Sequence, residues 1–109
     1  MATFAPIDTA PVLLGTADTI VGQPAAGKAW AIARVSFCNT DTVDRTVTIG
    51  TNDSGSLTDT QTEYKTLVVQ ALTSFDYGPA YLPALRRLIA KADVAAKVSA
   101  RIHGIERTP

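Results

Sequence analysis

A chain of 109 residues is long enough for one domain with a single modest core. Lys and Arg number 10, as do Asp and Glu, and this net charge of zero argues against a dedicated nucleic-acid binder, which carries a basic excess. One cysteine excludes an intrachain disulfide and a multi-cysteine zinc site, and no apolar run reaches the ~20 residues that cross a bilayer.

The first eleven residues contain two prolines, which disfavour regular strand pairing. They also contain Phe4 and Ile7, two apolar side chains suited to anchoring the segment on a partner. We therefore expect residues 1–11 to form an extended arm laid on a neighbouring subunit, with a disordered tail as the alternative, and residues 12–109 to form the folded domain. This segment has no basic leader and no long apolar stretch, so no signal peptide is expected.

The stretch GQPAAGK, residues 22–28, has the spacing that opens a phosphate-binding loop. However, Ala29 stands where that loop needs Ser or Thr, and Pro24 lacks the N–H that a phosphate cradle uses. An alternating strand follows where a helix is required. We therefore predict a hairpin-type turn between two strands, with no nucleotide and no other cofactor.

A two-residue alternation predicts strands through the first two thirds of the chain. In AWAIARVSFCN, residues 29–39, strict alternation places Val35 and Phe37 with three alanines on one face. It places Trp30, Ile32, Arg34, Ser36 and Cys38 on the other. Residues 45–51 form a second clear strand, and weaker strands are expected at 11–15, 19–23, 64–69 and 74–78. Cys38, without a second cysteine, is predicted to be a buried structural thiol.

The segment LPALRRLIAKAD fits two structures. Leu85, Leu88, Ile89 and Ala92 have helical spacing, whereas Leu88, Ala90 and Ala92 alternate as in a strand. We favour a loop at 83–86 and a strand at 87–92, and a helix that begins near Pro83 is the alternative. Residues 94–106 form the clearest half-exposed strand, because apolar and polar side chains alternate from Val94 to His103.

Seven or eight short strands, spaced 8–12 residues apart with turn residues between them, predict an all-β fold. The expected architecture is a single-domain antiparallel β-sandwich, jelly-roll-like, with the extended N-terminal arm outside it.

The charges are unevenly distributed along the chain. Residues 1–82 contain four Lys or Arg against eight acids, whereas residues 83–109 contain six against two. If the last two strands pair, their outward side chains form one basic patch that contacts an acidic surface of a twin subunit or a partner. A solvated strand face and contact with a DNA backbone are the alternatives. The predicted patch consists of Arg87, Lys91, Lys97, Arg101 and His103.

No catalytic, cofactor-binding or metal-ligating set emerges from the spacing. His103 is the only histidine, and Lys97 and Arg101 on the same face oppose a metal cation. We therefore do not expect an enzyme, and a small hydrolase that uses His103 is the minor alternative.

Four segments resemble small β-sandwich structural proteins of tailed bacteriophages: DTIVGQPAAGKAWAIARVSFCNTD, RTVTIG, YLPALRRLIAKAD and the late Gly104-Ile105-Glu106. The resemblance spans about residues 12–107. It implies a virion protein that is assembled in the host cytoplasm and has no catalytic residues. Capsid decoration or cement is the first expectation, and a head–tail neck or collar, or a tail or fibre component, is the alternative.

The implied partners are other virion proteins, such as the major capsid protein, and further copies of the chain in a trimer or ring. Specific binding to nucleic acid or membrane is not expected. From a different class of function, a carbohydrate-binding module remains an alternative, with Tyr64, Tyr77 and Tyr81 as the candidate aromatic residues.

Overall fold

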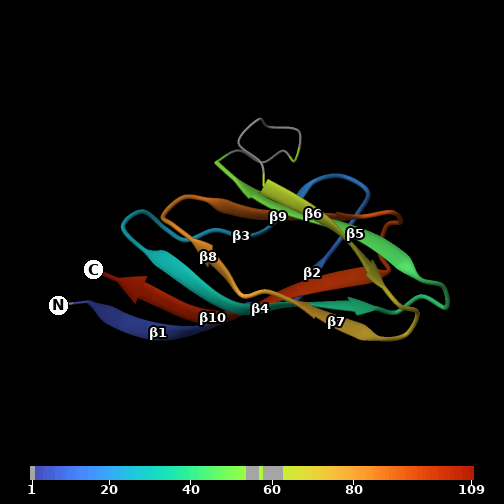
Figure 1. The fold of residues 1–109 in the computed structure, drawn as a ribbon, viewed down its shortest axis with the longest axis horizontal. Coiled ribbons are helices and arrows are strands. Elements are labelled where there is room, and N and C mark those ends of the chain that lie inside the picture. Colours follow the sequence, from blue (N-terminus) through green and yellow to red (C-terminus); the bar gives the residue numbers. More distant parts are fainter. Residues whose placement is uncertain (1, 54–56, 58–62) are drawn as a thin grey trace.

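The computed structural model describes residues 2–53, 57 and 63–109 and shows two antiparallel β-sheets packed face to face (Figure 1). The described part of the chain contains ten strands and no helix. A six-stranded sheet has the order β1-β10-β4-β7, with β2 beside β10 and β8 beside β4. A four-stranded sheet has the order β3-β9-β5-β6.

The six-stranded sheet consists of β1 (Thr3–Asp8), β2 (Val12–Leu13), β4 (Ala29–Asn39), β7 (Ser74–Tyr77), β8 (Ala80–Leu82) and β10 (Val98–Thr108). The four-stranded sheet consists of β3 (Thr19–Gly22), β5 (Arg45–Asn52), β6 (Glu63–Val69) and β9 (Arg87–Ala92). The predicted single-domain antiparallel β-sandwich is thus confirmed. The strand count exceeds the expected seven or eight, chiefly because β1 and the short β8 were not foreseen.

The core lies between the two sheets and is built mostly from small and β-branched side chains. Phe37 is fully buried at its centre, with 0% of its surface exposed. In β10 the residues Val98, Ala100 and Ile102 are buried, whereas the side chains between them are partly exposed, as the alternation predicts. Residues 94–97 form a turn, so the prediction that this strand begins at Val94 is wrong. Residues 87–92 form strand β9 and not a helix, which confirms the favoured interpretation.

A bulge in β4 changes the predicted faces of this strand. The partners of β10 jump from Arg34, opposite His103, to Ile32, opposite Gly104, so that Ala33 has no direct partner. An extra residue in one strand reverses the alternation beyond it. Ile32 is therefore buried with Val35, and the prediction that it shares a face with Arg34 is wrong.

The N-terminal segment is not a detached arm. Thr3–Asp8 forms β1, which pairs along its whole length with β10 of the same chain. Pro6 is tolerated because β1 lies at the edge of the sheet, where a missing N–H is not needed by a second neighbour. Phe4 and Ile7 are therefore held by their own domain, although Phe4 remains 68% exposed.

The GQPAAGK segment forms a turn, as predicted, but not a hairpin within one sheet. The Lys28 N–H donates to the Ala25 carbonyl at 3.0 Å, and Gly27 adopts a φ of +77° that suits glycine. The turn carries the chain from β3 in the four-stranded sheet to β4 in the six-stranded sheet. A strand and not a helix follows this turn, as the alternation predicts.

A second connection between the sheets follows β4. The buried Asn39 side chain donates through Nδ2 to the carbonyls of Val43 and Val69, both at 3.0 Å. Arg45 donates to the Asp41 carboxylate at 2.9 and 2.6 Å, and this hydrogen bond is the main reason why the pKa of Asp41 lies below its ordinary value of 3.8. These polar contacts fix the corner at which the chain changes sheet.

Candidate subunit-contact surface

An apolar row crosses the outer face of the six-stranded sheet. Pro6 of β1 lies opposite Ile105 of β10, Ile105 lies opposite Ala31 of β4, and Ala31 lies opposite Tyr81 of β8. Directly opposed residues in an antiparallel pair point to the same face. This face is the one away from the core, because the adjacent residues Ile32 and Leu82 are buried. We call Phe4, Pro6, Ala31, Tyr81 and Ile105 the outer row.

The members of the outer row are all exposed. Tyr81 is 64% exposed and Ile105 is 49% exposed. Phe4 lies two residues before Pro6 in β1 and therefore projects to the same side. A single exposed apolar side chain is normal in a soluble protein, whereas a contiguous group across four strands is characteristic of a contact surface.

Charged side chains occupy the same face beside the outer row. The Asp8 carboxylate accepts two hydrogen bonds from Arg101, both at 2.9 Å, and lies 3.1 Å from Nδ1 of His103. This cluster joins the edge strand β1 to β10. Arg101 and His103 are therefore engaged within the subunit and do not present an open basic surface.

The predicted basic patch does not form, because its two strands belong to different sheets. β9 pairs with β3 and β5, whereas β10 pairs with β1, β2 and β4. Arg87 instead donates to the Asp53 carbonyl at 2.7 Å, and the Lys91 ammonium lies 3.9 Å from the Asp18 carboxylate. Lys97 lies in the exposed turn that carries the chain from one sheet to the other.

Two further charged groups on the outer face have no ionic partner in the described part of the chain. Arg34 lies opposite His103, and Asp76 of β7 lies opposite Ser36 of β4. The Ser36 hydroxyl donates to the Asp76 carboxylate at 2.8 Å, but no cation among the described residues pairs with this carboxylate. Cys38 shares this face and is exposed, so the prediction of a buried thiol is wrong.

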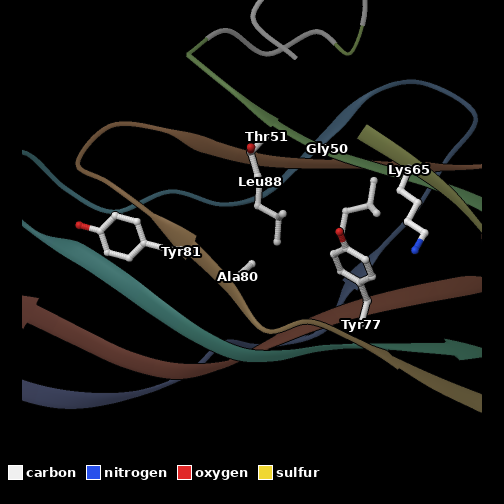
Figure 2. Close-up of a pocket in the computed structure, with 8 residues that line it drawn as sticks. Gly50, Thr51, Lys65, Tyr77, Ala80, Tyr81 and Leu88 are labelled. Carbon is white, nitrogen blue, oxygen red and sulfur yellow. The ribbon is translucent and has the colours of Figure 1, made fainter. Parts of the chain in front are cut away.

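A cavity of about 400 Å³ opens between the two sheets on the side of β6, β7 and β8 (Figure 2). Its lining is apolar at Ile49, Ala80 and Leu88 and carries polar groups at Thr51 and Lys65. Figure 2 shows Leu88 pointing toward Ala80, and the ring of Tyr81 pointing away from both. The described residues that line it include no histidine, cysteine or carboxylate.

The aromatic residues proposed for carbohydrate binding do not form one platform. Tyr77 and Tyr81 both line the cavity, but Tyr77 is partly buried, whereas the ring of Tyr81 projects from the outer face. The side chain of Tyr64 lies outside the described part of the structure. Among the described residues there is also no group of three or more His, Cys, Asp or Glu that is placed to hold a metal ion. These residues likewise form no helix that is long and apolar enough to span a membrane.

The fold is a small β-sandwich, and the outer row is an exposed apolar surface on its six-stranded sheet. No model of a known protein family matches the chain, and no curated protein matches it. A solved structure of Bacillus endospore appendages, described as a novel family of disulfide-linked pili, has a similar fold. The two share a TM-score of 0.56 and 17% sequence identity, over 99% of this chain and 89% of that chain.

This comparison corrects the functional prediction from sequence. The structure that shares the fold belongs to a bacterial spore pilus and not to a phage particle. The interpretation as a phage virion protein, in the capsid, neck or tail, is therefore wrong, and so are the predicted virion partners. The physical reason is that a thin β-sandwich of small aliphatic side chains is common to many unrelated structural proteins, so the pattern specifies the fold and not the assembly.

Proposed function

We propose that this protein is a structural subunit that associates with copies of itself to build a fibre of the pilus type on a bacterial surface. The observation that carries this proposal is the outer row, a contiguous apolar surface on a sheet whose inner face packs in the core. The similarity to a pilus subunit supports it at the level of the fold. The described residues that line the cavity fit packing better than chemistry.

The single cysteine determines how such a fibre is held together. Each copy has only Cys38, so a disulfide joins at most two subunits. A continuous chain of disulfide-linked subunits needs at least two cysteines in each. A fibre of this protein must therefore depend on non-covalent contacts along its length, which distinguishes it from disulfide-linked pili.

The test is assembly of the purified protein. Sedimentation and negative-stain microscopy at rising protein concentration, with and without a reducing agent, should show oligomers and then fibres that survive reduction. The same experiment with Cys38→Ser should give the same fibres. A protein that stays monomeric throughout, or fibres that dissolve on reduction, would contradict the proposal.

A further inference from the structure

We infer that a second copy of the chain docks face to face on the outer surface of the six-stranded sheet, about a two-fold axis. This inference rests on the proposed function and specifies one of the contacts that a fibre requires. The alternative is edge-to-edge pairing, in which a strand of one copy extends a sheet of the next.

The strand edges of the sandwich are poorly suited to extension. Pro6 interrupts the free edge of β1, and Pro79 separates β7 from β8 on the opposite edge of the same sheet. Proline has no N–H to donate to an added strand. In the other sheet, the edge strand β6 carries the exposed Lys65, and the edge strand β3 has only four residues. Prolines, lysines and short strands are the features by which proteins prevent edge pairing.

The outer face has no comparable feature that prevents association. Its apolar and charged side chains can also pair with the same side chains of a second copy. The outer row supplies apolar area, and the unpaired Arg34 and Asp76 supply one charge of each sign on the adjacent strands β4 and β7. In a two-fold contact, every pair of residues that meets across the interface occurs twice, with the two copies exchanged. The Arg34 guanidinium of one copy then pairs with the Asp76 carboxylate of the other, and the reverse pair forms at the same time.

This arrangement also sets a limit on the assembly. A two-fold contact closes on itself and produces a dimer. A fibre therefore requires a second, different contact that joins dimers, and the face described here supplies only the first.

The experiment compares dimerisation of the intact protein with that of two matched variants by analytical ultracentrifugation. Ile105→Lys places a charge in the middle of the outer row and should raise the dimer dissociation constant by about tenfold or more. Val68→Lys is the control, because Val68 is 59% exposed but lies on the other sheet. It should dimerise as the unmodified protein does. Equal dimerisation of the two variants would overturn the inference.

A charge exchange tests the two-fold pairing directly. Arg34→Asp and Asp76→Arg should each weaken the dimer, and the double variant should restore it. Restoration cannot result from misfolding, so it separates a specific contact from general damage. A double variant that is weaker than both single variants would contradict the reciprocal pair.

Cys38 provides an independent measurement, because it is exposed on the same face. A covered face should slow its alkylation as the protein concentration rises, and a spin label on Cys38 should report one distance between the two copies. Fibres that form while Ile105→Lys dimerises normally would overturn the face contact and leave the proposed function standing. Stable dimers that never form fibres would support the face contact and contradict the proposed function.

Discussion

Gly104 offers the sharpest test of the sheet geometry that places the outer row. It lies opposite Ile32, beside the bulge in the antiparallel pair of β10 and β4, and a Cβ atom added there would overlap with the Ala31 carbonyl oxygen. The same atom would lie 2.9 Å from Cα of Ile32. Both neighbours are backbone atoms of the central strand, so neither can rotate away. Gly104→Ala must therefore push β10 and β4 apart.

The cost follows from two contributions. Overpacking in a closely packed interior costs about 1–3 kcal/mol. Separation of the strands also weakens one or two ladder hydrogen bonds, each worth about 1 kcal/mol. The expected loss of unfolding free energy is about 2–5 kcal/mol, a large part of the roughly 5–15 kcal/mol that stabilises a domain. For a domain of this size the melting temperature should fall by about 15 °C.

Urea and thermal unfolding at low protein concentration measure this loss without a contribution from association. Gly15→Ala is the matched control, because the nearest atom to an added Cβ is 4.0 Å away. It should be neutral or slightly stabilising. The reasoning would be refuted if Gly104→Ala unfolded within about 0.5 kcal/mol of the unmodified protein, a difference typical of harmless surface changes.

Three further predictions concern the core and the corner after β4. Phe37→Ala should cost about 3–5 kcal/mol in urea unfolding, because it empties a fully buried site; a loss below 1 kcal/mol would contradict this packing. Asn39→Asp should destabilise the fold more than Asn39→Ala at pH 7, because the new carboxylate would face two carbonyl oxygens that now accept hydrogen bonds from Asn39. If Asn39→Ala proved the more destabilising change, these two hydrogen bonds would be contradicted. The Asp41 pKa is lowered below 3.8 in the folded state by the hydrogen bond from Arg45, so this pair stabilises the fold above that pH and its contribution disappears as the pH falls further. The stability difference between the unmodified protein and Asp41→Asn should therefore shrink from pH 7 to pH 2, and a constant difference would count against it.

Much of the fold is predictable from the sequence because local alternation reports burial directly. The strands at 29–39, 45–51 and 87–92 and the exposed phase of β10 all follow from a period of two. The pairing of strands does not follow, because it depends on contacts between residues far apart in the chain. The turn at Asp93–Lys97 has the composition of a hairpin, yet it connects two sheets. Because β9 and β10 lie in different sheets, their basic side chains do not form the predicted patch.

The outer row could not be predicted from the sequence as a surface, although Ile105 gave one signal of it. Ile105 continues the exposed phase of Ser99, Arg101 and His103, so an apolar residue stands where a polar one is expected. That signal marks one residue and not a surface. Only the register shows that Pro6, Ala31 and Tyr81 lie on the same line.

The bulge at Ala33 determines which side chains of β4 join the outer row. Without it, β4 would alternate strictly, and Ile32 would lie on the outer face opposite Ile105 while Ala31 turned toward the core. The extra residue exchanges these positions, so the large side chain fills the interior and the small one leaves a flat exterior around Ile105. Deletion of Ala33 should remove the bulge and still leave Ile32 opposite Gly104 and Ala31 opposite Ile105, so the core and the outer row should both be kept, whereas Ile105→Lys should affect association alone. A single irregularity in one strand thus connects the stability of the domain to the surface through which we propose it assembles.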